Sequence, residues 1–176
     1  MNNPVLEALR TRRSIRAFEP RQITEEELNT ILEAGTWAPT AKGLQDPWIV
    51  AVQRPELLKK LSAMNAAAWG RDTDPFYGAP TYIFVFASGP EGRANGVCDG
   101  SLVLGNMMLA AHAIGLGSCW INREREMFGT PEGKELMREW GLPDGLFGIG
   151  ALAVGYPAAK APQPKARKEG YSRIIR

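Results

Sequence analysis

The stretch from Gly100 to Asn122, GSLVLGNMMLAAHAIGLGSCWIN, predicts the centre of the fold. Residues 101–114 carry no Lys, Arg, Asp or Glu, and their Leu, Met and Ala side chains favour a helix. Because apolar residues fall on every side of a 3.6-residue period, we expect a helix buried on all faces, in part by a second copy of the chain. It is shorter than the roughly 20 apolar residues that cross a bilayer, so we predict no membrane partner. Residues 115–122 form a glycine-rich turn into a short strand, whose bare backbone is typical of a ligand contact.

The composition of the chain indicates one ordinary globular domain. It has 176 residues, of which 44% are hydrophobic and 23% charged, and a formal net charge of +2. Six Lys or Arg residues and one acid lie in residues 157–176, which leaves the remainder slightly acidic. We therefore expect a single domain over residues 1–176, with the Pro-rich residues 157–176 as an extended C-terminal arm. A basic arm on a nearly neutral body favours a local anion site, with nucleic-acid binding as the weaker alternative.

The cysteines and the histidine exclude several kinds of site. Cys98 and Cys119 lie in apolar surroundings without CxxC spacing, which predicts reduced core thiols in a cytoplasmic protein. The single histidine, His112, lies inside the apolar stretch, so we expect a core residue and neither a His-rich metal site nor a serine triad. No P-loop or GxGxxG fingerprint follows a strand. We predict no metal and no catalytic side chain, with the reactive group supplied by a cofactor.

Periodicity and capping signals place the other elements. Thr24 and Glu27 form a capping box at the start of a helix that continues to about Trp37. Residues 81–87 are a continuous apolar run, which is typical of a strand buried on both faces. Further helices are expected at residues 4–11, 55–65 and 130–141, and further strands at residues 48–52 and 147–154.

Residues 12–16, Arg-Arg-Ser-Ile-Arg, follow the first expected helix and have two interpretations. Cations near a helix C-terminus complement its dipole, with a solvated face beyond. Alternatively, two guanidinium groups and a hydroxyl on one turn form a phosphate clamp through charge-assisted, bidentate hydrogen bonds. The cluster alone is consistent with both.

Five motifs in order along essentially the whole chain resemble the nitroreductase family. They are residues 12–18 (RRSIRAF), residues 37–41 with 44–45 and 47–48 (WAPTA, LQ and PW), residues 76–80 (FYGAP), residues 115–121 (GLGSCWI) and residues 153–157 (AVGYP). No single motif is decisive, but five in sequence argue against chance. The resemblance implies an α+β fold with a mixed β-sheet wrapped by helices, and an intertwined homodimer with FMN at its interface.

The resemblance also implies which residues bind FMN. The phosphate and ribityl end would be held by Arg12, Arg13, Ser14 and Arg16. The backbone beside the flavin N5 edge would come from Cys119, Trp120, Ile121 and Asn122. The segment that reaches the flavin from the partner subunit would be Pro39, Thr40, Ala41, Gly43 and Gln45, with Thr for the family's Ser and Gly for its Asn. The basic pair that closes the phosphate site would be Lys165 and Arg167, and Asn65 is a candidate amide for the pyrimidine ring.

Residues 69–77 are expected to form a mobile cover over the flavin. Gly70 and Gly78 bracket this loop as hinges, and its acidic residues, Asp72 and Asp74, are expected to be solvated. The aromatic side chains that would stack on a flat acceptor are Trp69, Phe76 and Tyr77. In the alternative interpretation, Phe76 and Tyr77 fill the core beside the strand at residues 81–87.

The activity implied by the resemblance is electron transfer from NADH or NADPH, through FMN, to a nitroaromatic or quinone by a ping-pong mechanism. A dehalogenase or flavin-fragmenting enzyme of the same fold is one alternative. A flavin-binding or storage protein without turnover is another. The physiological acceptor and the choice between the two nucleotides stay open.

Overall fold

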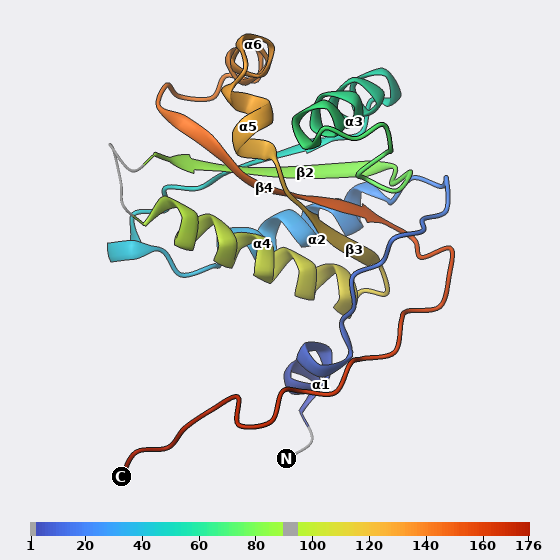
Figure 1. The fold of residues 1–176 in the computed structure, drawn as a ribbon, viewed down its shortest axis with the longest axis vertical. Helices are drawn as coiled ribbons and strands as arrows, with labels where there is room; N and C mark the ends of the chain where they lie inside the picture. Colours follow the sequence, from blue (N-terminus) through green and yellow to red (C-terminus); the bar gives the residue numbers. More distant parts are fainter. Residues whose placement is uncertain (1–2, 90–94) are drawn as a thin grey trace.

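The computed structural model describes residues 3–89 and 95–176, and in this part of the chain a four-stranded antiparallel sheet forms the middle layer. The strands lie in the order β1-β2-β4-β3. Their bounds are Trp48–Val52 for β1, Thr81–Ser88 for β2, Gly117–Ile121 for β3 and Leu146–Gly155 for β4. Helices cover both faces of this sheet (Figure 1).

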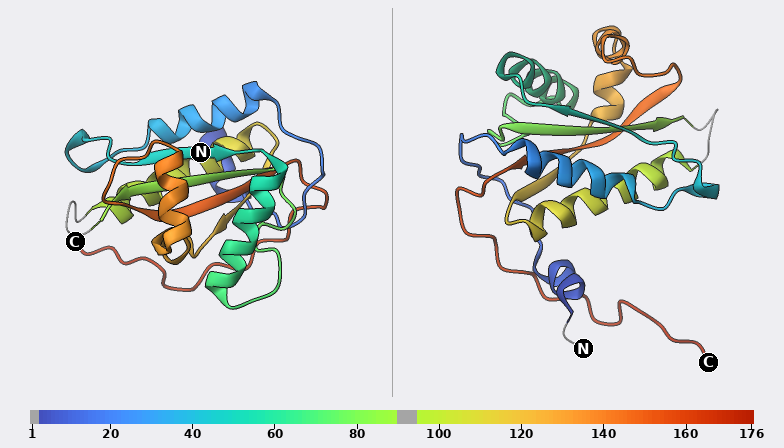
Figure 2. Two further views of the ribbon diagram at one scale, coloured as in Figure 1. Left: turned by 90° about the horizontal axis from the view of Figure 1, so that it is seen from above. Right: turned by 180° about the vertical axis from the view of Figure 1, so that it is seen from behind.

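The helices divide between the two faces. One face is covered by α2 (Glu25–Thr36) and α4 (Gly96–Ala113), and the other by α3 (Pro55–Trp69), α5 (Glu124–Gly129) and α6 (Pro131–Glu139) (Figures 1 and 2). The short helix α1 (Pro4–Thr11) lies apart from both layers, and a 3-10 turn, η1 (Ala41–Gly43), precedes β1. No helix in the described ranges has the length and apolar character needed to cross a membrane.

The strand β2 separates two hydrophobic cores, as its sequence predicts. Ile83 and Val85 pack with α2 and α4, whereas Tyr82, Phe84 and Phe86 pack with α3, α5 and α6. Alternate residues of a strand point to opposite faces, and helices cover both faces here, so each of these side chains is buried. The expected strand buried on both faces is therefore confirmed.

The capping box of α2 is also confirmed. The Glu27 amide donates to the Thr24 hydroxyl at 3.2 Å, and the Thr24 amide donates to the Glu27 carboxylate at 2.8 Å. Tyr156 donates its hydroxyl to the same carboxylate at 2.6 Å and so ties α2 to the residue after β4. These hydrogen bonds lower the pKa of Glu27, with the Tyr156 bond as the largest cause, and the positive charge of Arg21 lowers it further.

Several boundaries and one pairing differ from expectation. The α+β class is confirmed, but the strands pair antiparallel throughout, and parallel pairing among the described residues is limited to a bridge between Ser14 and Ser118. Helix α3 continues past Asn65 to Trp69 and ends at Gly70, whose φ of 68° is left-handed. Helix α4 begins at Gly96, ahead of the apolar run, and α5 was not expected at all.

One chain covers only one face of helix α4, and the burial of the other face by a second copy stays a prediction. Val103, Leu104 and Met107 face the sheet and are buried. Val97 and Leu102 on the outer face are 49% and 47% exposed. Cys98 on the same helix is exposed as well, so its predicted place in the core is wrong, whereas Cys119 is buried as expected.

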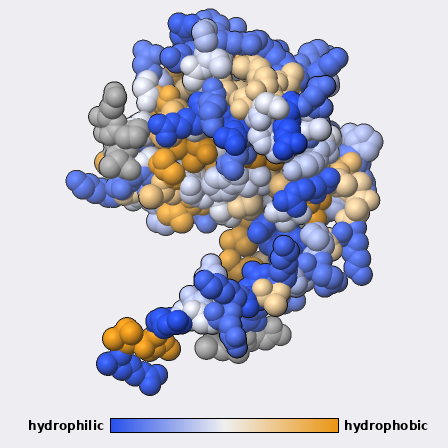
Figure 3. Space-filling model, viewed as in Figure 1, coloured by the Kyte–Doolittle hydropathy of each residue, from blue (hydrophilic) through white to orange (hydrophobic). Residues whose placement is uncertain are grey.

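The C-terminal residues 158–176 leave the body without forming a helix or strand. They run past the layer that contains α4 and away from the sheet (Figure 1). Tyr171, Ile174 and Ile175 are exposed on this segment, and the apolar surface near the C-terminus stands out in the space-filling view (Figure 3). The apolar end of this arm is therefore not covered by any other part of the described chain.

Candidate functional site

The basic turn, residues 12–16, follows α1 and pairs with β3. The Ile15 amide donates to the Ser118 carbonyl at 3.0 Å, and Ser14 pairs with Ser118 in the parallel bridge. One guanidinium nitrogen of Arg13 donates to the carbonyls of Arg10 and Arg12 at 2.7 and 2.6 Å. Arg13 thus satisfies carbonyl groups at the C-terminus of α1, as a cation at a helix end is expected to do.

A basic cavity of about 230 Å³ lies beside this turn. The residues that line it are Arg12, Arg13, Ile15, His112, Gly115, Leu116, Ser118, Pro157 and Ala161. Three of its polar atoms, Nη1 of Arg12, Nε of Arg13 and Oγ of Ser118, are buried and have no hydrogen-bond partner in the described part of the chain. Buried donors are rarely left unpaired, so this cavity suits a ligand with several oxygen acceptors, such as a phosphate group.

His112 lies at the edge of the basic cavity and not in the core, which corrects the sequence prediction. Its Nε2 lies 2.8 Å from the Thr11 hydroxyl, which itself donates to the Glu7 carbonyl at 2.8 Å. Burial lowers the pKa of His112 first, and the positive charges of Arg12 and Arg13 lower it further. The same field that disfavours an imidazolium attracts an anion.

A second cavity of about 230 Å³, the aromatic cavity, lies at the end of β3. Its lining residues are Asn65, Trp69, Pro75, Tyr77, Trp120, Ile121, Asn122 and Arg123. The Arg16 guanidinium lies 5.9 Å from the centre of the Tyr77 ring, which links the basic turn to this cavity. The turn therefore reaches both cavities, with Arg12 at one and Arg16 beside the other.

The loop at residues 69–77 supplies two of its three predicted aromatic side chains to the aromatic cavity. Trp69 and Tyr77 line it and are 46% and 37% exposed. Phe76 is instead fully buried and stacks on Tyr82 with ring centres 3.8 Å apart, so the prediction that it contacts a substrate is wrong. The two neighbours separate because Tyr77 has a left-handed φ of 58°, which turns the chain between them.

Asp74 is exposed, as expected, and its carboxylate also organises the middle of this loop. Its Oδ1 accepts hydrogen bonds from the Ser62 hydroxyl at 2.6 Å and the Phe76 amide at 2.9 Å. Its Oδ2 accepts from the Gly78 amide at 2.6 Å. These bonds fix the turn that presents Tyr77, so the loop forms a wall of the aromatic cavity. The mobility expected of this loop stays a prediction.

A buried polar network closes the far side of the aromatic cavity. The Asn65 amide nitrogen donates to the Asn122 carbonyl at 2.7 Å and to Oε1 of Glu124 at 3.1 Å. Glu124 is 1% exposed, and burial raises its pKa to about 8. Glu124 was missed from sequence because it lies in the charged run Arg123–Glu126, which is typical of a solvated face. The available signal was the spacing of Glu124, Met127 and Phe128, which places all three on the buried face of α5.

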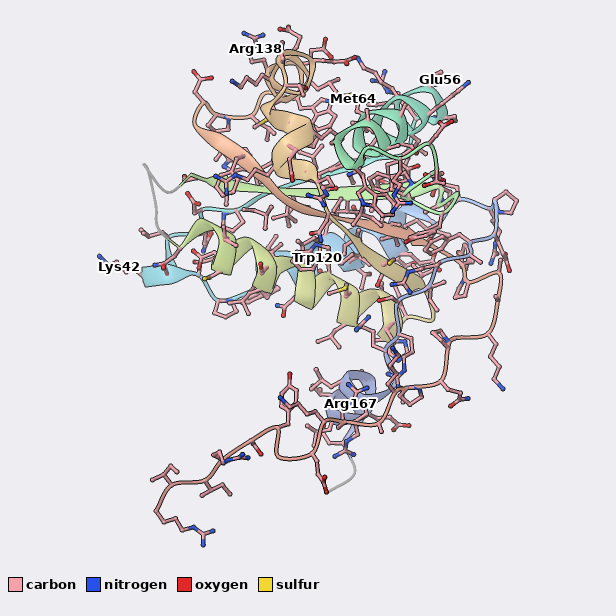
Figure 4. All side chains as sticks on the ribbon, in the orientation of Figure 1. Lys42, Glu56, Met64, Trp120, Arg138 and Arg167 are labelled. Carbon is pink, nitrogen blue, oxygen red and sulfur yellow. The ribbon has the colours of Figure 1, made fainter. Side chains whose placement is uncertain are left out.

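The predicted partner-facing segment lies elsewhere in the molecule. Lys42 within it and Trp120 on β3 are well separated in the view of Figure 4. The Ala41 amide donates to the buried Asp99 carboxylate at 3.1 and 3.2 Å, and the Gln45 amide donates to the Thr40 hydroxyl at 2.9 Å. This segment, with its Pro39, does not meet the basic turn within one chain.

Gly43 has a left-handed φ of 65°, and a Cβ at this position would meet no atom within 4 Å. Glycine and asparagine are the residues that adopt this conformation most readily. The family pattern has Asn at this point, so the exchange preserves the backbone while it removes an amide. The turn that presents the segment therefore does not depend on that side chain.

The basic pair in the arm is exposed. Within the described residues, the hydrogen bonds found for it join neighbouring residues of the arm. Arg167 donates to the Lys165 carbonyl at 2.6 and 3.2 Å. Figure 4 shows Arg167 below the sheet, in the part of the view that holds α1.

Cys119 is buried within β3, and burial raises its pKa, so its thiol is suited to packing and not to nucleophilic chemistry. One chain thus brings together residues 12–16 and 119–122, but neither residues 39–45 nor Lys165 and Arg167.

Comparisons with known proteins agree on one family. The model of the nitroreductase family matches residues 9–156. A protein of Methanothermobacter thermautotrophicus, provisionally named an NADH dehydrogenase/NAD(P)H nitroreductase, is 32% identical over 158 residues, which are 88% of this chain and 78% of that protein. A Bacillus subtilis protein named an FMN reductase acting with NAD(P)H is 27% identical over 183 residues, 95% of this chain and 72% of its own length.

A solved structure supports the same relationship. The nitroreductase with bound FMN from Bacteroides fragilis has a TM-score of 0.90 and 30% identity, covering 99% of this chain and 100% of that one. The FMN-dependent nitroreductase from Clostridium difficile has a TM-score of 0.87 and 27% identity, with the same coverage. Because the family match runs from the end of α1 to the residue after β4, and so includes the basic turn and β3, the chain belongs to the nitroreductase family.

Proposed function

We propose that the protein is an FMN-dependent oxidoreductase that passes electrons from NAD(P)H to an electron-poor acceptor, a nitroaromatic or a quinone. The observation that carries the proposal is the basic cavity, where Nη1 of Arg12 and Oγ of Ser118 are buried without partners beside the backbone of β3. A phosphate ester would satisfy both groups. Named relatives use FMN and NAD(P)H, and the Bacteroides fragilis structure contains FMN.

The residues present fit FMN in two parts. Arg12, Ser14 and Arg16 would hold its phosphate and ribityl end through charge-assisted hydrogen bonds, with Arg13 shared between this site and the end of α1. The backbone from Cys119 to Asn122 would run along the flavin ring, at the wall of the aromatic cavity. When bound, FMN supplies the redox chemistry, taking a hydride equivalent from NAD(P)H and giving two electrons to the acceptor.

The chain's own residues position the reactants and exclude water. Trp69 and Tyr77 offer aromatic faces to a flat nicotinamide or acceptor ring at the aromatic cavity. Since nucleotide and acceptor would use the same face in turn, the mechanism is ping-pong. No side chain is assigned as an obligatory acid or base, so positioning and electrostatics carry the protein's contribution.

The site is proposed to be completed by a second copy of the chain. The outer face of α4 leaves Val97 and Leu102 about half exposed, and the arm ends in exposed Ile174 and Ile175. Apolar surface of this kind on a helix and on an arm favours an intertwined homodimer. In the dimer, residues 39–45 would reach the flavin of the partner, and Lys165 and Arg167 would close a phosphate site.

Two measurements test the proposed function. The purified protein is expected to be yellow, to release FMN on heating, and to oxidise NADH or NADPH in steady state faster when a quinone or nitroaromatic acceptor is added. A protein that holds FMN but shows no acceptor-dependent oxidation would be a flavin-binding protein without turnover. A colourless protein that fails to take up added FMN would refute the proposal.

A further inference from the structure

Glu124 has no part in the function proposed above, although it is the most deeply buried acidic side chain among the described residues. It begins α5 and packs against β4 so closely that a Cβ on Gly148 would lie 2.6 Å from its backbone and Cβ. Oε1 accepts the hydrogen bond from Asn65, while Oε2 is buried without a partner in the described chain. A carboxyl group kept in such a place needs a reason, because an apolar side chain of the same size would pack there without the desolvation cost.

The partner of Glu124 faces the aromatic cavity. Asn65 projects from α3 and lines the cavity together with Asn122. A backbone carbonyl can only accept a hydrogen bond, so the 2.7 Å contact with the Asn122 carbonyl requires the nitrogen of the Asn65 amide at that point. The second N–H of the same nitrogen is directed to Glu124. Both donors are occupied, and the group that the amide retains for a ligand is its oxygen, an acceptor.

We propose that Glu124 is a positioning residue that holds the Asn65 amide with its oxygen toward the aromatic cavity, so that the cavity selects a ring that carries an N–H donor. The inference rests on the proposed function, because the ring in question is the flavin. Oxidised isoalloxazine has one N–H group, the imide N3–H, and acceptors at N1, N5, O2 and O4. An amide held as an acceptor can therefore recognise the N3–H edge alone.

The neutral form of Glu124 is sufficient for this role. A protonated carboxyl keeps a carbonyl oxygen that accepts from the Asn65 N–H, and burial favours the protonated form. Without an acceptor at position 124, one N–H of Asn65 would be buried unpaired, which is costly enough to release the amide from its fixed orientation. A side chain that only fills the volume of Glu124 therefore does not replace the hydrogen-bond acceptor for Asn65.

The test compares two variants of nearly equal volume. Glu124→Gln keeps an acceptor oxygen beside Asn65, whereas Glu124→Met fills the same space without one. Each full-length protein is stripped of flavin and titrated with FMN and with N3-methyl-FMN, and flavin fluorescence quenching gives the two dissociation constants. Asn65→Ala removes the amide, so its preference for FMN over N3-methyl-FMN measures the effect of the size of the methyl group alone. Far-UV circular dichroism checks that each protein is folded.

The wild type and Glu124→Gln are expected to prefer FMN over N3-methyl-FMN by about tenfold more than Asn65→Ala does, a ratio typical of one buried hydrogen bond. Glu124→Met is expected to show the reduced preference of Asn65→Ala. A Glu124→Met protein that keeps the wild-type preference, or loses affinity equally for both flavins, would overturn the proposal. Loss of the preference in Glu124→Gln would do the same even where Glu124→Met does not fold. A wild-type protein that binds neither flavin would instead refute the proposed function.

Discussion

The raised pKa of Glu124 predicts how stability depends on pH. Burial is its largest cause, and the pKa moves from the ordinary value of 4.5 to about 8. Between these two values the folded protein keeps the proton on Glu124 while the unfolded chain loses it. The contribution of this group to stability is therefore full below pH 4.5, falls as pH rises, and is lost above about pH 8.

The magnitude follows from proton linkage. One proton bound only in the folded state lowers the free energy of unfolding by about 1.4 kcal/mol per pH unit, so this group alone costs about 3 kcal/mol between pH 5.5 and 7.5. Glu124→Gln removes the titration while it keeps the shape. The difference in stability between wild type and Glu124→Gln should therefore shift in favour of the variant by about 3 kcal/mol across that range.

Urea unfolding at pH 5.5, 6.5 and 7.5, at one protein concentration and with excess FMN, measures this difference. Glu126→Gln is the matched control. Glu126 is half exposed, and its hydrogen bond with Arg123 at 2.8 Å lowers its pKa, so it does not titrate between pH 5.5 and 7.5. That variant should follow the wild-type slope. Wild-type and Glu124→Gln stabilities that run parallel from pH 5.5 to 7.5 would refute the assignment of a buried, protonated carboxyl.

Four further predictions test the flavin site and its surroundings. Arg12→Ala should weaken FMN binding by about 10- to 100-fold in a folded protein, since it removes a charge-assisted hydrogen bond. An unchanged dissociation constant, measured by fluorescence quenching, would contradict this. Arg16→Glu should abolish flavin retention on purification. Removal of residues 158–176 should lose both the dimer and FMN, and a stable monomer that keeps FMN in sedimentation would exclude the arm from the interface. Trp69→Ala should change the ratio of kcat/KM between quinone and nitroaromatic acceptors while FMN affinity stays nearly constant. Equal losses for all acceptors would exclude Trp69 from acceptor selection.

Elements whose signals are local could be predicted from the sequence. The capping box of α2 needs only Thr24 and Glu27, and both of its hydrogen bonds form. The strand β2 is buried on both faces because its apolar run leaves no polar side to expose. The contact between the basic turn and β3 joins segments about a hundred residues apart, and it was expected only because the motifs resemble those of a family.

Features that depend on distant packing could not be predicted. The apolar composition of α4 predicts burial on all sides, in part by a second copy, but it does not indicate that the chain's own sheet covers the face with Val103 and Met107. Phe76 and Tyr77 are adjacent aromatic residues with no difference in local pattern, and the turn held by Asp74 sends one into the core and the other to the cavity. Charge predicts a solvated Glu124, whereas the packing of α5 on β4 buries it.

Backbone strain offers an independent indication of where function lies in this fold. In the described chain, the non-glycine residues with positive φ are Lys42, Gln45, Tyr77 and Arg123. Each costs roughly 1 to 2 kcal/mol relative to an ordinary conformation, so selection for stability alone would not favour them. Tyr77 and Arg123 line the aromatic cavity, and Lys42 and Gln45 lie on either side of Gly43 in the partner-facing segment. The strained positions thus fall at the aromatic cavity and on the partner-facing segment, which the proposed dimer would bring to one flavin although a single chain holds them apart.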